Sequence, residues 1–244
     1  MHDSLWRARN GLRRLVAGLP PAGGPVSPEA PTAVFAALSS IYRFAGRFVA
    51  GKAVLDWGCG TGFGSAILGA AGAGSVVGVD PDAAAIRYAR RRFAGPGVGF
   101  RSGALEPAGP DLPPFERLVA VGTLARLRDP EAALPALAGA MGPEGLLVAS
   151  VPPLLDGQTL ELHLARHPGA ARLYLWDWAD LLGRRFRELR LYAHQPPAGV
   201  ELDLASPRPS PLDPESFRFE EVPLSDLDNV GTLGAVFVGV GPGR

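Results

Sequence analysis

A run of nine residues, VLDWGCGTG at positions 54–62, joins a hydrophobic segment to three closely spaced glycines. Gly58, Gly60 and Gly62 permit positive φ angles and let a ligand approach the main chain closely. Asp80 follows in the segment VVGVDPD, 20 residues after Gly60, where its carboxylate could accept hydrogen bonds from both hydroxyls of a ribose. Because ligands of open α/β sheets bind at the carboxyl ends of the strands, these residues predict a site for a nucleoside-containing cofactor. The other interpretation of Asp80 is that it only caps the helix that follows.

The spacing of the glycines argues against a dinucleotide. The dinucleotide fingerprint is G-x-G-x-x-G, and its third glycine position, counted from Gly58, is occupied by Phe63. Asp56 stands two residues before Gly58 and would repel a pyrophosphate, whereas its negative charge would favour a cationic sulfonium that carries an amino group. A nicotinamide-dependent oxidoreductase is therefore the least favoured function.

Short hydrophobic runs alternate with longer helical patterns along the chain. Strands separated by helices of this length need crossover connections, which produce a parallel sheet covered on both faces. The pattern therefore predicts an α/β fold. The expected strands are 53–57, 75–79, 98–101, 118–121, 146–151, 188–192 and 234–240, and the expected helices are 32–50, 62–71, 82–93, 130–140 and 177–185.

The composition limits the classes of function. Of 244 residues, 47% are hydrophobic and 20% are charged, and Lys+Arg (24) balance Asp+Glu (24). This excludes disorder throughout, because disordered chains combine low hydrophobicity with high net charge. Nucleic-acid binding usually needs a basic surface, so no nucleic-acid partner is expected. The single cysteine, Cys59, excludes a disulfide within the chain and favours a cytoplasmic location, and no segment is long and apolar enough to predict a transmembrane helix.

Three segments lie outside the alternation of strands and helices. Residues 1–31 read as a basic amphipathic helix followed by a proline-rich linker, and residues 32–244 as the main domain. The helix could cap this domain or lie on an anionic membrane surface. The other two segments, 152–171 and 195–228, are expected to be inserts, and the second is expected to form a lid or a surface excursion, since loops of this length are usually functional or mobile.

The Asp-x-Gly-x-Gly-x-Gly sequence from Asp56 to Gly62, the spacing to Asp80 and the alternation of elements together resemble the class I S-adenosylmethionine-dependent methyltransferases. The resemblance extends over about residues 44–240. It implies a Rossmann-like, doubly wound, mostly parallel sheet of seven strands with the last strand antiparallel. It also implies S-adenosylmethionine as the methyl donor and S-adenosylhomocysteine as the product. Residues 174–195 are similar to a bacterial subgroup often found with glycan or secondary-metabolite biosynthesis.

The resemblance also implies which residues bind the cofactor. Asp56 and the glycines would surround the methionine part, Asp80 would bind the ribose hydroxyls, and Pro81 would lie beside the adenine. Cys59 is expected to pack beneath the cofactor rather than act as a nucleophile. The complete expected set is Asp56, Gly58, Cys59, Gly60, Gly62, Asp80, Pro81, Ala104, Leu105 and Thr123.

The sequence departs from the family pattern in two places. Ala104 stands where the family often has an acidic residue for the adenine amino group, which leaves the backbone, Glu106 or no group for that contact. After the fourth expected strand, Ala125 and Arg126 replace a common Glu-His pair. The expected function is methyl transfer to a small-molecule or saccharide acceptor. The alternative is a binding or regulatory protein that keeps the fold but has weak or no activity.

No catalytic residue can be assigned from the sequence, although His163 and His167 are candidates for a general base. They lie four residues apart in a region where substrate-facing groups often arise in this family. The same spacing could serve a metal, but the first histidine is not followed by the glutamate of an HExxH motif and Pro168 limits the helix. We therefore expect no metal site and regard surface histidines as the default interpretation. The sequence leaves room for a homo-oligomer.

Overall fold

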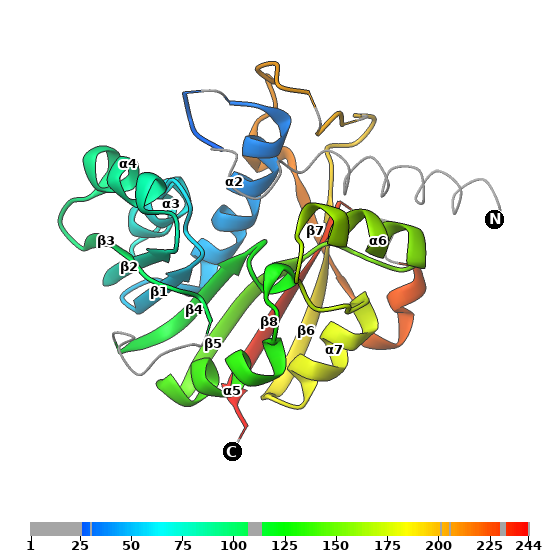
Figure 1. Ribbon diagram of the computed structural model, residues 1–244. Coiled ribbons are helices and arrows are strands. Elements are labelled where there is room, and N and C mark those ends of the chain that lie inside the picture. Colours follow the sequence, from blue (N-terminus) through cyan, green and yellow to red (C-terminus); the bar gives the residue numbers. More distant parts are fainter. Residues whose placement is uncertain are drawn as a thin grey trace.

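The computed structural model describes residues 26–29, 31–106, 114–200, 202–204, 206–229 and 233–243. The predicted N-terminal amphipathic helix lies outside these residues. The α-helices are α2 (Ala33–Ala45), α3 (Phe63–Ala70), α4 (Ala83–Phe93), α5 (Pro130–Ala140), α6 (Gly157–Arg166) and α7 (Leu175–Gly183) (Figure 1). Four 3-10 helices are described: η1 (Gly46–Phe48), η2 (Leu124–Arg126), η3 (Pro214–Ser216) and η4 (Leu224–Asn229).

The strands are β1 (Ala53–Trp57), β2 (Ser75–Asp80), β3 (Val98–Ser102), β4 (Phe115–Val121), β5 (Met141–Val151), β6 (Phe186–Gln195), β7 (Arg218–Val222) and β8 (Gly234–Pro242). They form one sheet in the order β3-β2-β1-β4-β5-β8-β6-β7. The pairs from β3 to β5 are parallel, and β8 is antiparallel to both β5 and β6. The α/β class, the mostly parallel sheet and the antiparallel last strand are confirmed.

The predicted count of seven strands was wrong by one. The additional strand, β7, pairs antiparallel with β6 and comes from the segment 195–228, which the sequence presents as an excursion. Three of its five residues, Arg218, Glu220 and Glu221, are charged. Strand β7 lies at the edge of the sheet, and its residues are exposed or half-buried. Charged residues are common on edge strands, where they prevent pairing with other chains, and they conceal the strand from a search for hydrophobic runs.

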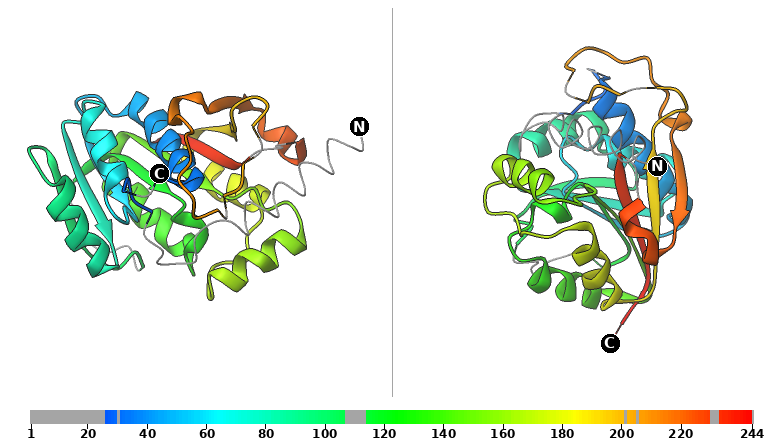
Figure 2. Two further views of the ribbon diagram at one scale, coloured as in Figure 1. Left: turned by 90° about the horizontal axis from the view of Figure 1, so that it is seen from above. Right: turned by 90° about the vertical axis from the view of Figure 1, so that its right-hand side faces the viewer.

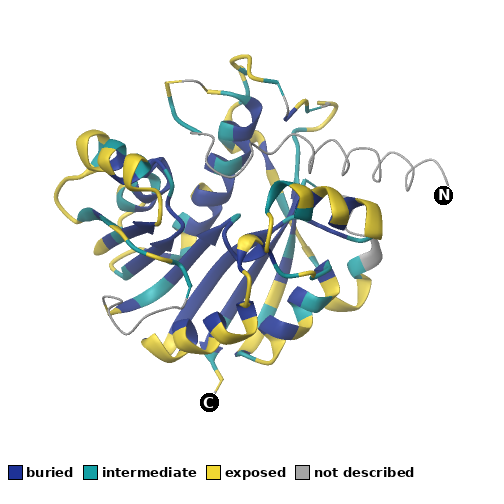
Figure 3. Cartoon of the chain, in the orientation of Figure 1, coloured by how far each residue is buried: buried dark blue, intermediate teal, exposed yellow. Residues whose placement is uncertain are grey.

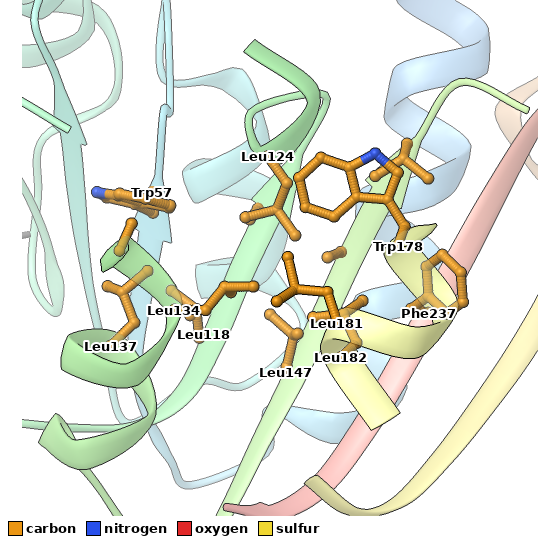
Figure 4. Packing of buried hydrophobic residues seen from close by; sticks show 14 of the residues in the cluster. Trp57, Leu118, Leu124, Leu134, Leu137, Leu147, Trp178, Leu181, Leu182 and Phe237 are labelled. Atoms are coloured by element: carbon orange, nitrogen blue, oxygen red, sulfur yellow. The ribbon is translucent and has the colours of Figure 1, made fainter. Parts of the chain in front are cut away.

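Helices cover both faces of the sheet (Figure 2). Side chains of a strand alternate between its two faces, and β4 shows this directly. Leu118 and Ala120 belong to a cluster with residues of α5 and α7, whereas Val119 and Val121 belong to a cluster with residues of α2 and α3. Figure 4 shows the first cluster, with leucines of α5 and α7 against β4 and β5. The central strands β1, β4, β5 and β8 are mostly buried, and the outer surfaces of α4 and α5 are exposed (Figure 3).

Side chains at the helix N-termini explain where several helices begin. Thr32 caps α2 by accepting a hydrogen bond from the Phe35 amide. Asp82, Asp129 and Asp156 cap α4, α5 and α6 in the same way, as is typical of Asp and Thr. The segment 152–171 that we expected to be an insert therefore contains α6.

The segment after β6 packs against the first half of α2. Leu204 and Phe217 are buried in one cluster with Ala33, Val34 and Ala37. The Ser210 amide donates to the Pro31 carbonyl at 2.8 Å. Part of the predicted excursion therefore covers a helix of the main domain. Of the helices described here, none has the length and apolar character needed to cross a membrane.

Candidate active site

The glycine-rich turn connects β1 to α3 at the carboxyl end of β1. Gly58, Gly60 and Gly62 have φ angles of 82°, 52° and 85°, which side chains rarely adopt. At Gly58 a Cβ would lie 2.1 Å from Oγ1 of Thr123, so the two segments approach too closely for any side chain. A Cβ on Gly60 would meet no atom within 4 Å. The turn thus packs closely against Thr123 at Gly58 and leaves open space at Gly60.

The turn ends in a helix N-terminus that can hold a negatively charged group. Gly62 is the N-cap of α3 and supplies no side-chain cap. The first amides of a helix lack partners within the helix and attract anions. This end of α3 therefore fits a carboxylate such as that of a methionine moiety.

Asp80 ends β2 beside the turn and is 7% exposed. Its Oδ2 accepts a hydrogen bond from the Gly60 amide at 2.9 Å, and its Oδ1 accepts one from the Asp82 amide at 2.9 Å. A carboxylate has about four acceptor positions, so both oxygens can accept further bonds from a ribose. The N-cap of α4 is Asp82, not Asp80. Pro81, next to it, is exposed, which leaves room for a ring.

The carboxyl group of Asp56 faces the helices rather than open space. Asp56 has no exposed surface, its Oδ1 accepts from Oη of Tyr42 at 3.1 Å, and its Oδ2 accepts from Oγ of Ser65 at 2.6 Å. Its neighbours Leu55 and Trp57 point to the opposite face of the sheet, so the alternation of β1 sets this direction. Neither Tyr42 nor Ser65 was predicted from the sequence to belong to the site. Through them Asp56 fixes the turn against α2 and α3.

Burial raises the pKa of Asp56 to about 7. The carboxyl of an unfolded chain has a pKa of about 3.9, so between these values the folded protein holds a proton that the unfolded chain releases. We expect Asp56 to lower the free energy of unfolding as the pH rises from about 4 to about 7. Asp56→Asn does not titrate. Denaturant unfolding should show the wild type losing about 2–3 kcal/mol more than this variant between about pH 5 and pH 8. Equal pH dependence in the two proteins would contradict the assignment.

The side chain of Cys59 packs into the protein interior beneath the turn. It is 3% exposed and packs with Ile86, Ala89 and Phe100. Burial raises the pKa of its thiol well above the usual range, so the thiol stays protonated and is a poor nucleophile. The packing role expected from the sequence agrees with this environment.

The loop after β3 contains the residues expected near the adenine. Ala104 is exposed, and Leu105 packs partly against the central cluster. The Glu106 carboxylate accepts from the amides of Arg128 and Asp129 at 2.9 and 2.7 Å. Both of its oxygens therefore join this loop to the start of α5. Each oxygen keeps an acceptor position, so Glu106 and the backbone both stay candidates for the adenine amino contact.

Thr123, the expected binding residue after β4, is fully buried. Its Oγ1 lies 3.4 Å from the Val121 carbonyl, and the side chain occupies the space beside Gly58. The Thr123 side chain thus packs against the turn at Gly58.

A segment before α2 also contacts the turn. Oγ1 of Thr61 donates to the Val26 carbonyl at 2.5 Å, and the Glu29 carboxylate accepts from the Tyr88 hydroxyl and lies 3.5 Å from Nε of Arg92 on α4. Residues 26–29 thus connect the turn to α4. This contact was not predictable from the sequence, because the linker is rich in proline and glycine and has no periodic pattern.

His163 and His167 are brought together by α6, with ring centroids 4.7 Å apart. Contrary to the default expectation, His163 is buried, and its Nε2 lies 2.7 Å from the Ala125 carbonyl, which makes Nε2 the donor. Nδ1 of His167 is buried without a hydrogen-bond partner. Burial lowers the pKa of His163, and lowers that of His167 to about 4, so both are neutral at pH 7. No cluster of three potential metal ligands occurs among the described residues.

Comparisons with known proteins agree with this geometry. Residues 33–191 match the family described as Methyltransferase domain. The fold is similar to that of an S-adenosylmethionine-dependent methyltransferase from Thermotoga maritima, with a TM-score of 0.61 and 19% identity over 85% of this chain and 89% of that one. A methyltransferase from Haloferax volcanii, solved in complex with the Trm112 methyltransferase activator, has a TM-score of 0.58 and 17% identity, covering 84% and 90%.

A third similar structure is the YcgJ protein from Bacillus subtilis, with a TM-score of 0.58 and 14% identity over 85% of this chain and 99% of that one. At these identities the structural matches show the fold alone. The comparison with curated proteins finds no match. The family match covers more than half of the sequence, and it includes the turn, Asp80 and both histidines. The chain therefore belongs to the methyltransferase domain family.

Proposed function

We propose that the chain transfers the methyl group of S-adenosylmethionine to a small-molecule or saccharide acceptor in the cytoplasm. The observation that supports the cofactor site best is Asp80. Its carboxylate lies at the end of β2, bonded to the Gly60 amide and with acceptor positions to spare. In this proposal Asp80 holds the ribose, the backbone of Gly58, Gly60 and Gly62 lies along the methionine part, and Pro81 borders the adenine.

The remaining residues of the expected set take supporting roles in this proposal. Asp56, Cys59 and Thr123 are buried in or beside the turn, and their packing holds its backbone in place. Ala104 and Leu105 form the wall on the adenine side. Asp56 acts through its hydrogen bonds with Tyr42 and Ser65, which hold the turn beside the methionine part.

When bound, S-adenosylmethionine supplies an electrophilic methyl carbon. The methyl group would pass to a lone pair of the acceptor, S-adenosylhomocysteine would be the leaving group, and the acceptor's proton would pass to water. The chain's task is then to hold donor and acceptor in line, and such positioning can supply up to about 7–11 kcal/mol in ideal cases. The buried and mutually bonded residues around the turn suit that task because they leave little freedom to the donor side.

The class of acceptor is inferred from the net charge of the chain and from the segments that cover the turn and α2. The chain's formal net charge is zero, which disfavours polyanionic nucleic acids as substrates. The segment after β6 packs over α2, and residues 26–29 lie across the turn. A site covered by these segments favours a small acceptor that the protein can enclose.

Calorimetric titration with S-adenosylhomocysteine tests the cofactor part of the proposal. We expect saturable binding to one site per chain, and NAD in the same experiment should give no heat, because the third glycine of its fingerprint is Phe63. Absence of heat with S-adenosylhomocysteine at millimolar concentration would contradict the proposal. A screen of hydroxyl, amine and saccharide acceptors for release of S-adenosylhomocysteine then tests the acceptor class.

A further inference from the structure

A cavity of about 630 Å³ opens where α2 and α3 meet the segment 214–219. Its lining residues come from α2, η1, α3, η3, β7 and the residues beside them, and none belongs to the turn at 58–62 or to the end of β2. Cavities of roughly 300–1,000 Å³ are typical of small-molecule sites. We propose that this cavity is a second ligand site, and that it takes a small anion with a flat apolar body.

Helix α2 separates this cavity from the glycine-rich turn. Ser40, Arg43, Phe44 and Arg47 line the cavity, and their spacing of three or four residues places them on one side of α2 and its continuation η1. Tyr42 lies on another side of the helix, where its hydroxyl reaches Asp56. The cavity and the turn are thus on different sides of the same helix.

Aromatic side chains give the cavity flat apolar walls. The rings of Phe44 and Phe219 are stacked, with centroids 4.5 Å apart and planes at 21°. Phe217 is buried, and Ile67 and Ala70 of α3 also line the cavity. A hydrocarbon or heteroaromatic body would find dispersion contacts with these apolar side chains.

The charged groups of the lining are exposed and carry a net positive charge. Arg43 and Arg47 oppose a single acidic lining residue, Glu215. Nη1 of Arg43 lies 2.8 Å from Oε1 of Glu215, with both side chains about half exposed or more (49% and 67%). Such exposed ion pairs contribute only about 0–1 kcal/mol, so an incoming anion can compete for Arg43.

Arg47 is the more available of the two arginines. Within the described residues it has no acidic partner, and its guanidinium lies 5.2 Å from the centroid of the Phe44 ring. A guanidinium binds carboxylate, phosphate or sulfonate oxygens with two parallel hydrogen bonds. The cation therefore lies over the ring of Phe44, where an anion bound to it would stand beside the apolar lining.

A buried pair, Ser40 and His194, fixes the aromatic residues of the cavity. Oγ of Ser40 lies 2.8 Å from Nε2 of His194 and donates to the Ala37 carbonyl at 2.8 Å. The His194 ring stacks on Phe217 and Phe219, with centroids 5.2 and 4.9 Å away. Because Ser40 uses its proton on α2, His194 is the donor in this pair. The aromatic wall is thus held in place without a ligand, which reduces the cost of ordering it on binding.

The test uses the fluorescent probe 8-anilinonaphthalene-1-sulfonate, which combines a sulfonate with an aromatic body. N-phenyl-1-naphthylamine, which has the same aromatic body without the sulfonate, serves as the uncharged control. Titrations are made first without and then with excess S-adenosylhomocysteine, which in the proposed function occupies the turn. We expect the sulfonate probe to bind saturably at one site per chain and the uncharged control to bind at least about tenfold more weakly. Displacement of the probe by S-adenosylhomocysteine would place it at the turn and overturn the proposal, as would absence of saturable binding.

Two arginine variants locate the site. Arg47→Gln should weaken binding of the sulfonate probe by about tenfold, because one decade corresponds to about 1.4 kcal/mol and a hydrogen bond to a charged group contributes that much or more. Arg91→Gln removes an exposed charge from α4, away from the cavity, and should leave the affinity unchanged. Thermal unfolding verifies that both variants are folded. Equal affinity of Arg47→Gln and wild type, or an equal loss in Arg91→Gln, would overturn the proposal. The outcome is independent of methyl transfer.

Discussion

Asp80→Ala is expected to weaken binding of S-adenosylmethionine by at least about tenfold. Hydrogen bonds from ribose hydroxyls to a carboxylate are charge-assisted and contribute about 1.5–3 kcal/mol each in a sheltered site, and about 1.4 kcal/mol is one decade of affinity. The same change removes the acceptor of the Gly60 and Asp82 amides. We therefore also expect a lower melting temperature. Calorimetry with the cofactor and thermal unfolding measure the two effects on one sample.

Asp82→Ala is the matched control, because it changes the same residue type two positions further along. The Asp82 carboxylate accepts from the amides of Ala84 and Ala85 at 2.7 and 3.2 Å and caps α4. Loss of an Asp cap costs about 0.5–2 kcal/mol of stability, and we expect cofactor affinity to stay the same. If Asp80→Ala behaved like Asp82→Ala, destabilised but with unaltered affinity, the ribose assignment would be wrong.

Gly64→Ala should destabilise the protein by about 1–3 kcal/mol, as overpacking of a buried site does. Gly64 lies in the first turn of α3, and a Cβ there would stand 2.1 Å from the ring of Tyr42. The ring must move, which breaks the hydrogen bond from Tyr42 to Asp56 and loosens α2 from the turn. Denaturant unfolding measures the loss. Because the proposed cofactor site is built on the turn, we also expect weaker binding of S-adenosylhomocysteine.

The control for this prediction makes the same substitution at Gly139. That glycine is near the end of α5, and its Cβ would meet nothing within 4 Å. Alanine is favoured over glycine in helices by about 0.5–1 kcal/mol, so Gly139→Ala should raise stability slightly. Opposite signs for two Gly→Ala changes in helices isolate the steric effect of the Tyr42 ring. A neutral or stabilising Gly64→Ala would show that Tyr42 does not hold the turn.

The local part of the site was predictable from the sequence. The glycines of the turn and Asp80 follow buried strands whose hydrophobic runs are short and clear, and the parallel order of these strands places their carboxyl ends side by side. The three positive φ angles are the physical reason for the glycines. The direction of Asp56 also follows from its place in β1, but only after the face of the sheet covered by α2 and α3 is known.

Contacts between distant segments were not predictable in the same way. Tyr42 and Ser65 reach Asp56 from two helices, and neither residue type nor spacing marks them. His163 looked like a surface residue, because nothing in a short amphipathic helix shows that the Ala125 carbonyl lies opposite it. Strand β7 was missed because an edge strand with charged side chains lacks the hydrophobic run that identified the other strands.

The position of β8 has a consequence for how the chain acquires its structure during synthesis. Residues Ala235, Val236 and Phe237 are completely buried between β5 and β6, although β8 is the last strand of the sheet to be made. The parallel strands from β1 to β5 can associate as they emerge, but β6 and β7 have no place in the sheet until residues 234–242 arrive. Until then the apolar edge of β5 is open to other chains. A pause in translation before β8 would prolong this aggregation-prone interval.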